Sequence, residues 1–225
     1  MPTLILARHG RTTANASGML AGRTPGVHLD AKGREQARSA ASRLEGLSLQ
    51  AAISSPLVRC RETARLLAPE HGVEIDSGLN ECDYGQWAGQ SLATLAKDPL
   101  WKTVQAHPSA ARFPGGESMA QMSARAVSAV RARNASLSGD SVWLAVTHGD
   151  IIKAILADAL GVHLDAFQRI VVDPASLSIV RYETNGCFVL GTNTHHGSLA
   201  ALGAKRPKRG RKQAAVGGGQ GEVNL

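Results

Sequence analysis

The chain has 225 residues, of which 43% are hydrophobic and 19% charged, and its formal net charge is +7. This composition excludes a fibrous or wholly disordered chain and is typical of a soluble globular protein with one sizeable core. The chain has three widely spaced cysteines and no apolar run near the roughly 18 residues that span a membrane, so we expect a cytoplasmic protein with reduced thiols.

The first predicted elements are a strand and a helix joined by a long loop. An apolar run at residues 4–7 predicts a buried strand that ends at residues 8–10, Arg-His-Gly. A polar, glycine-rich loop follows as far as residue 30. Alanine and leucine then recur at helical spacing over residues 31–44, and Gly46 ends this predicted helix.

A strand, a helix and another strand are expected next. Residues 51–53 predict a short strand. Ser55 and Pro56 are typical of a helix N-cap followed by a first-turn proline, so a helix is expected from residue 57 to about residue 71. A third short strand is expected at residues 73–75.

The segment at about residues 85–116 has the features of a lid. It is flanked by glycines, follows a predicted strand end and contains a helical pattern over residues 91–106. A long amphipathic helix is predicted after it, at residues 117–137. The larger side chains of the segment suggest a partly apolar wall beside a site, and they are Trp87, Leu95, Trp101, His107 and Phe113.

The last third of the chain predicts a strand, a helix and a hairpin. An apolar strand at residues 142–146 ends at residues 147–149, Thr-His-Gly, and a helix is expected over residues 150–160. Two further strands, at residues 178–182 and 187–190, are joined by a Thr-Asn-Gly turn.

Strands that alternate with helices and end in a hairpin predict an α/β fold, a three-layer sandwich with a mostly parallel, mixed sheet flanked by helices. We expect one domain over residues 1–202 and a disordered, basic tail over residues 203–225. Without the tail, 19 of the 25 basic and 17 of the 18 acidic residues remain, a net charge of +2. The folded part is therefore close to neutral.

Two of the predicted strands end at a histidine, His9 and His148. Ligands of open parallel sheets bind beyond the carboxyl ends of the strands, so these two imidazoles are expected to meet over one site. Arg8, Arg59 and Glu81 also lie at predicted strand or helix ends. Two fixed cations, two imidazoles and one carboxylate describe a site for a phosphate dianion, at which a neutral histidine can act as nucleophile.

Four motifs follow one another along the chain: Arg8-His9-Gly10-x-Thr12-x-x-Asn15, Ser54-Ser55-Pro56-x-x-Arg59-x-x-x-Thr63-Ala64, Leu79-x-Glu81-x-x-x-Gly85-x-Trp87-x-Gly89 and Thr147-His148-Gly149. In this order and at these separations they resemble the histidine phosphatase superfamily, also called the phosphoglycerate mutase-like family. The similarity spans about residues 3–197. A single Arg-His-Gly triplet is a weak signal, whereas the four motifs together are specific.

The resemblance implies a set of catalytic residues. His9 matches the residue that becomes phosphohistidine, and Arg8, Arg59 and His148 match residues that hold the phosphoryl oxygens. Glu81 matches the proton donor, which protonates the leaving oxygen and later takes a proton from the attacking water. A histidine phosphatase, a phosphoric monoester hydrolase, is therefore expected.

Further contacts with the substrate are expected from the same motifs. Asn15 matches a contact in the phosphate pocket, and Gly149 lies in the last motif, beside the expected site. Arg23, in the glycine-rich loop, is a weaker candidate for substrate contact, and its alternative role is an exposed loop charge. The family needs no metal, and we expect neither a metal nor a cofactor here. The pair His195-His196 has no third ligand in its surroundings and is not expected to bind one.

The leading hypothesis is a metal-independent phosphomonoesterase that hydrolyses a small phosphorylated metabolite. The alternative is a phosphoglycerate-mutase-like phosphomutase, which has to hold a second anionic group and for which the lid offers Lys97, Lys102 and Arg112. A third hypothesis is weak, nonspecific binding of nucleic acid or another polyanion through the basic tail. A catalytically idle binding module is disfavoured, because no residue of the catalytic set is missing. The substrate and the oligomeric state stay open.

Overall fold

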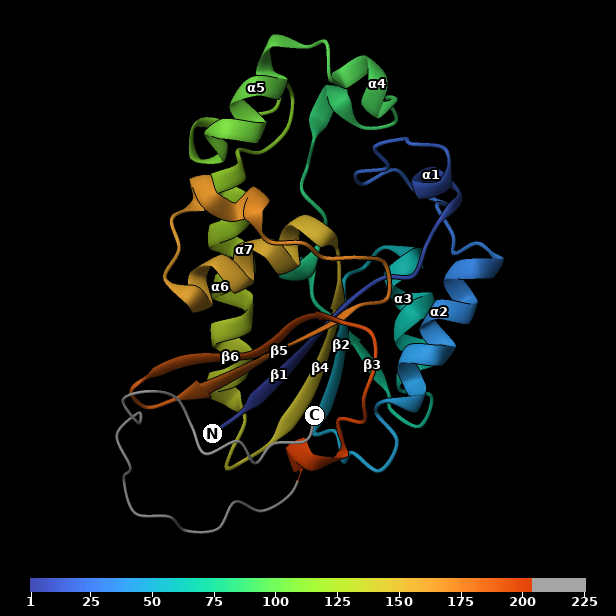
Figure 1. Cartoon of the computed structure of the whole chain (residues 1–225), viewed down its shortest axis with the longest axis vertical. Coiled ribbons are helices and arrows are strands. Elements are labelled where there is room, and N and C mark those ends of the chain that lie inside the picture. Colours follow the sequence, from blue (N-terminus) through green and yellow to red (C-terminus); the bar gives the residue numbers. More distant parts are fainter. Residues whose placement is uncertain (204–225) are drawn as a thin grey trace.

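The structure, a computed structural model, describes residues 1–203. The predicted tail lies outside the described residues from Ala204 onward (Figure 1). Gly203, expected in that tail, instead ends a short 3₁₀ helix, η5 (Ala200–Gly203).

One mixed sheet runs through the described residues. Its strands are β1 (Thr3–Arg8), β2 (Ala51–Ser54), β3 (Val73–Ile75), β4 (Val142–Thr147), β5 (Leu177–Glu183) and β6 (Gly186–Thr194). They lie in the order β3-β2-β4-β1-β5-β6. The first four pair in parallel, and β5 and β6 form an antiparallel hairpin against β1. The predicted α/β fold with a mostly parallel, mixed sheet is confirmed.

Helices cover both faces of the sheet (Figure 1). The helices on one face are α2 (Ala31–Ser42) and α3 (Val58–Leu67), and those on the other face are α6 (Met119–Ser136) and α7 (Gly149–Leu160). Successive residues of a strand point to opposite faces, and β1 feeds both layers. Leu4 and Leu6 join the core under α6 and α7, whereas Ile5 and Ala7 join the core under α2 and α3. A central strand buried on both faces therefore reads as an unbroken apolar run.

The helix predicted from residue 57 to about residue 71 is shorter in the structure, and Ser55, its predicted N-cap, lies before the observed N-cap. α3 begins at Val58, and its N-cap, Leu57, makes no side-chain cap bond. The Ser55 hydroxyl is buried and lies 2.8 Å from His148 Nε2. The same oxygen accepts a longer hydrogen bond, of 3.4 Å, from the Leu57 backbone, so the hydroxyl makes a local contact and a shorter tertiary one. α3 ends at Leu67, earlier than predicted.

The lid-like segment lies above the carboxyl ends of the parallel strands (Figure 1). It contains η2 (Gly85–Trp87), α4 (Leu92–Leu95), α5 (Pro99–Ala106) and η3 (Pro108–Ala110). The single helix predicted over residues 91–106 is therefore divided in two. Asp98 caps α5 by accepting a hydrogen bond from the backbone of Leu100, and Pro99 cannot continue the preceding helix.

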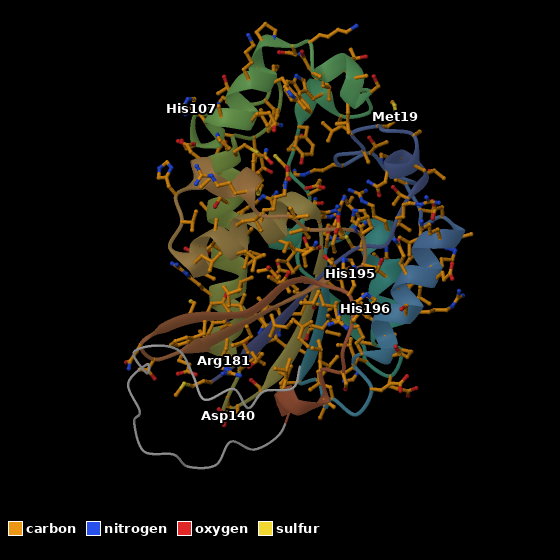
Figure 2. The ribbon with its side chains drawn as sticks, viewed as in Figure 1. Met19, His107, Asp140, Arg181, His195 and His196 are labelled. Atoms are coloured by element: carbon orange, nitrogen blue, oxygen red, sulfur yellow. The ribbon has the colours of Figure 1, made fainter. Side chains whose placement is uncertain are left out.

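The remaining short elements are α1 (Thr13–Ala16), η1 (Ser77–Leu79) and η4 (Leu164–Arg169). Figure 2 shows Met19, just after α1, near the lid, and Asp140, just before β4, at the opposite end of the molecule. The four parallel strands, β1 to β4, thus run from the end that holds Asp140 toward the lid. Among residues 1–203, no helix combines the length and the apolar character needed to cross a membrane.

Candidate active site

The carboxyl ends of β1 and β4 bring the two predicted histidines together. The strands are neighbours in parallel register, with Arg8 opposite Thr147, and the His9 backbone donates a hydrogen bond of 3.0 Å to the Thr147 carbonyl. His9 and His148 therefore leave the sheet side by side. Their ring centroids lie 5.3 Å apart, in an edge-on arrangement.

The His9 imidazole is buried and held in one orientation. Its Nδ1 lies 2.8 Å from the Gly10 carbonyl oxygen, and Arg59 Nε donates to its Nε2 at 3.3 Å. Burial lowers the pKa of His9 well below its usual value, and the positive charges of Arg59 and Arg8 lower it further. The ring is therefore neutral at physiological pH.

Two arginines bring buried positive charge to the same place. Arg59, from the first turn of α3, is only 2% exposed, and its Nη2 donates to the Gly22 carbonyl at 2.8 Å. Arg8 Nη1 donates to the Val172 carbonyl at 2.6 Å. Arg59 Nη1 and Arg8 Nε are buried donors without a hydrogen-bond partner among residues 1–203. Buried polar groups are nearly always paired, and these two donors are available to an anion at this position.

His148 is fully buried behind this position. Arg59 Nη2 donates to its Nδ1 at 3.2 Å, which leaves the ring proton on Nε2, where the Ser55 hydroxyl accepts it at 2.8 Å. Burial lowers the pKa of His148 well below its usual value. The Cys60 thiol lies 3.4 Å from Nε2, and burial raises the pKa of this thiol to about 12. Cys60 is thus a packed, protonated neighbour of the imidazole.

Glu81 is the carboxyl group nearest to the imidazole pair. Its Oε1 accepts a hydrogen bond of 2.9 Å from the Cys82 backbone, and its Oε2 lies 3.5 Å from His148 Nδ1. Burial raises the pKa of Glu81 to about 7, with a further contribution from the negative charge of Asp150. The group therefore changes its protonation state near neutral pH, as a general acid and base must.

Two arginines hold the backbone of Glu81 from behind. Arg23 Nε and Arg125 Nη2 both donate to the Glu81 carbonyl oxygen, at 2.8 and 2.9 Å. The carboxylate of Glu117 accepts from both arginines and from the Asp83 backbone. We call Arg23, Glu117 and Arg125 the brace. Arg23 does not line the cavity, so its expected contact with substrate gains no support from its position.

A cavity of about 330 Å³ opens over these groups. Arg8, His9, Arg59 and Glu81 line its inner part, and Asn15 and Gly149 also border it. Asn15 Oδ1 accepts hydrogen bonds from the backbone and hydroxyl of Thr12 and is thereby fixed in place. An added Cβ at Gly149 would lie 3.4 Å from Arg8 Nε, an ordinary contact, so Gly149 lies directly beside the Arg8 guanidinium.

The outer part of the cavity is formed mainly by the lid. Trp87, Trp101 and Phe113 line it, as the sequence indicated. Leu95 instead packs in the core, and His107 is exposed, with its Nδ1 3.9 Å from Asp165. Figure 2 shows His107 on the flank of the molecule, away from Met19, which does border the cavity.

Several residues that line the cavity were not predicted from the sequence. The Tyr84 hydroxyl donates to Asp150 at 2.7 Å, and Lys153 lies 3.5 Å from the same carboxylate. Asp150 directly follows the His148-Gly149 motif, and this adjacency is the one signal that could have identified it. Within residues 1–203, no group of three or more His, Cys, Asp or Glu side chains is placed to hold a metal ion.

Known proteins share this architecture. The sequence profile of the histidine phosphatase superfamily (branch 1) matches residues 4–195 of this chain. The chain is 33% identical over 187 residues to a probable phosphoglycerate mutase, GpmB, of Salmonella choleraesuis, an alignment that covers 81% of this chain and 86% of that protein. The resemblance found from the four motifs is confirmed.

Solved structures of phosphatases superpose on the described fold. A putative alpha-ribazole-5'-P phosphatase from Escherichia coli K-12 gives a TM-score of 0.79 at 26% identity, over 88% of this chain and 98% of that one. A mycobacterial glucosyl-3-phosphoglycerate phosphatase, in complex with VO3, gives a TM-score of 0.77 at 26% identity, over 85% of this chain and 98% of that one.

Proposed function

The chain belongs to the histidine phosphatase superfamily (branch 1) and is an enzyme of that class, and on this premise we propose that it hydrolyses a small phosphomonoester through a phosphohistidine at His9. The observation that carries the proposal is the 2.8 Å contact between His9 Nδ1 and the Gly10 carbonyl. A carbonyl oxygen only accepts, so the ring proton stays on Nδ1 and Nε2 keeps its lone pair. A neutral imidazole with this tautomer is a nucleophile.

The buried donors beside His9 support binding of the phosphoryl group. Arg59 Nε already lies 3.3 Å from His9 Nε2, and the unpaired donors Arg59 Nη1 and Arg8 Nε are buried near the same cavity. A phosphoryl group placed against His9 would accept hydrogen bonds from these guanidinium groups. In phosphoryl transfer most of the rate enhancement comes from such positioning and charge stabilisation.

Glu81 is suited to handle the proton. A leaving alkoxide needs a proton as its bond to phosphorus breaks, and a carboxyl group with a pKa of about 7 is partly protonated at neutral pH. His148 Nδ1 accepts a hydrogen bond from Arg59 Nη2, and the Oε2 atom of Glu81 lies 3.5 Å from the same nitrogen. The acid, the nucleophile and the cations therefore border one space.

The proposed reaction has two balanced steps. In the first, His9 Nε2 forms a bond to phosphorus, the ester P–O bond breaks, and Glu81 gives its proton to the leaving oxygen. In the second, ionised Glu81 takes a proton from water, the water oxygen bonds to phosphorus, and the P–N bond to His9 breaks. Inorganic phosphate leaves, and both side chains return to their starting states.

A phosphomutase is the second candidate, because the curated relative from Salmonella choleraesuis is named a probable phosphoglycerate mutase. A mutase that works through a bisphosphate has to bind a second anionic group. The lid cations Lys97, Lys102 and Arg112 are all exposed and none of them lines the cavity. Their positions favour hydrolysis over transfer.

Replacement of the nucleophile tests the proposal. We expect His9→Ala to lower turnover of every phosphomonoester by at least roughly 10⁴-fold, because the variant lacks the nitrogen on which the proposed covalent intermediate forms. The control is His196→Ala, which removes an exposed imidazole outside the cavity and is expected to keep wild-type turnover.

The intermediate itself can be trapped. Wild-type enzyme quenched with radiolabelled substrate in alkaline denaturant is expected to retain label on His9, stable in alkali and released by acid. Label on a serine or aspartate would contradict the mechanism. Added bisphosphoglycerate is expected to leave hydrolysis unstimulated, whereas a mutase would require it for transfer.

A further inference from the structure

The outer cavity has an unusual share of the aromatic residues of this chain. The chain contains only three Trp, two Tyr and three Phe residues, and four of these eight line the one cavity: Tyr84, Trp87, Trp101 and Phe113. Trp87 and Trp101 stack at 6.1 Å between ring centroids, and Phe113 meets Trp87 edge-on at 5.2 Å. Tyr84, Trp87 and Phe113 are almost fully buried, whereas Trp101, which stacks on Trp87, is partly exposed. Trp101 is therefore the ring that another apolar or aromatic group can contact, with a gain in free energy.

The charges of the outer cavity cancel one another. Beyond Arg8 and Arg59, the cation that lines the cavity among the described residues is Lys153. Its Nζ lies 3.5 Å from Asp150 and 3.1 Å from Gln168 Oε1, so both a carboxylate and an amide oxygen already face it. The positive charge available to a second anionic group is therefore small. A carboxylate or phosphate on the leaving group would lose hydration here without a matching free cation.

The size of the cavity limits the leaving group. About 330 Å³ lies at the lower end of the range for small-molecule sites, and the phosphoryl group occupies part of that volume. One ring system with a short linker to the ester oxygen fits the remaining space better than an extended nucleotide or a peptide.

From these features we infer that the preferred substrate is the phosphate monoester of an uncharged alcohol that carries an aromatic ring. The inference rests on the proposed function and names the substrate class of the same site. The phosphoryl group lies on His9, Arg8 and Arg59, and the ring of the alcohol packs against Trp101 and its neighbours. Carboxylated esters, phosphoglycerates among them, are poor substrates because Asp150 neutralises Lys153.

Three alkyl esters separate the contributions of ring and charge. The alcohol of 2-phenylethyl phosphate is uncharged and carries an aromatic ring. The alcohol of glycerol 3-phosphate is uncharged and has no ring, and that of 3-phosphoglycerate carries a carboxylate. Wild-type kcat/KM is expected to fall in that order, by roughly tenfold at each step. All three leaving groups are alkoxides, so the demand on the proton donor is similar.

Two variants test the two halves of the inference. Trp101→Ala is expected to lower kcat/KM for 2-phenylethyl phosphate by roughly tenfold and to change that for glycerol 3-phosphate by less than about twofold. Asp150→Asn leaves Lys153 without its carboxylate, so the ratio of kcat/KM for 3-phosphoglycerate to that for glycerol 3-phosphate is expected to rise by roughly fivefold or more. The ratio cancels any change in Glu81, because both esters need the same proton.

Matched variants control for damage to the lid. Trp101→Phe keeps a ring at the wall and is expected to keep most of the preference for the aromatic ester. Lys102, the next residue of α5, is exposed and does not line the cavity. Lys102→Ala is expected to leave kcat/KM for all three esters within about twofold of wild type.

The outcomes distinguish the inference from the function on which it rests. Turnover through phosphorylated His9 with 3-phosphoglycerate as the best of the three esters would overturn the substrate class and leave the phosphatase intact. An equal loss on all three esters in Trp101→Ala, with no restored preference in Trp101→Phe, would also overturn it. No hydrolysis of any of these esters or of p-nitrophenyl phosphate would overturn both proposals.

Discussion

At the scale of single residues, the burial of Glu81 decides at which pH the site can act. The pKa of about 7 means that the carboxyl group holds its proton below neutral pH and loses it above. A general acid acts only while it is protonated, so in the proposed mechanism formation of the phosphohistidine from an alkyl ester is expected to slow as the pH rises through this value. An aryl leaving group needs no proton and escapes this limit.

Glu81→Gln tests that dependence. The amide oxygen can still accept from the Cys82 backbone, but the group has no proton to give. We expect kcat/KM for an alkyl phosphate to fall by roughly 10²–10³-fold and that for p-nitrophenyl phosphate by less than about tenfold. In wild type, the alkyl value is expected to decline above about pH 7, and in the variant this decline disappears. Equal losses on both esters would show that Glu81 positions substrate without donating a proton.

Site residues that belong to motifs could be predicted from the sequence, whereas hydrogen bonds between distant segments could not. His9, Arg59, Glu81 and His148 were all found from ordered motifs, and the structure gathers them at one cavity or directly behind it. Ser55 stands in the second motif, but the role predicted for it is that of a helix cap, because nothing local shows that its hydroxyl reaches His148. A hydrogen bond between side chains 93 residues apart has no signature in either segment.

At the scale of elements, the brace joins the long helix α6 to the loop that carries Glu81. Arg125, on α6, donates to the carbonyl oxygens of Gly78, Asn80 and Glu81 and to both oxygens of Glu117. The direction of the Glu81 side chain therefore depends on a helix that does not touch the reacting atoms, and Arg125 is a positioning residue.

Arg125→Met removes these hydrogen bonds and keeps most of the side-chain length. We expect kcat/KM for an alkyl phosphate to fall by roughly tenfold with little change for an aryl phosphate, because placement of the proton donor is lost and the nucleophile is kept. The free energy of unfolding is expected to fall by roughly 2 kcal/mol, measured by denaturant titration. Arg131→Met, on the exposed side of α6, is the control. It is expected to leave kcat/KM for both esters and the free energy of unfolding nearly unchanged. A uniform loss on both esters would indicate general damage to the fold.

The elements with strong periodicity were predicted well, and those shaped by tertiary contact were not. β1 and β4 are continuous apolar runs because helices cover both of their faces. The lid was recognised as a segment but not in its internal structure. Its helical pattern is interrupted by Asp98-Pro99, whose cap and first-turn signals could have placed the second helix.

At the scale of the whole molecule, the topology places the site. β1, β2 and β4 are adjacent and parallel, although they come from the beginning, the first quarter and the second half of the chain. Their shared direction delivers His9, Ser55 and His148 to one edge. Alternation of strands and helices was enough to predict a mostly parallel, mixed sheet. The strand order was not predicted, and the lining of the cavity depends on side-chain packing that periodicity does not encode.

The basic tail is expected to add charge without catalysis. Truncation after Leu202 removes six basic residues and one acidic residue. Turnover of a small ester is therefore expected to stay within about twofold of wild type, and retention on heparin is expected to weaken in a salt-dependent way. A large loss of turnover would show that the tail contributes to the site.

The unpaired donors of Arg8 and Arg59 also bear on how the folded state responds to its solution. Desolvated guanidinium groups with unmatched hydrogens weaken the native state, and an oxyanion that matches them strengthens it. Inorganic phosphate, the product of the proposed reaction, is such an anion, and at about 100 times its Kd it would add roughly 2.7 kcal/mol to the free energy of unfolding. A melting temperature recorded in phosphate buffer thus describes the enzyme with its product, and one recorded in a buffer without oxyanions describes the enzyme alone.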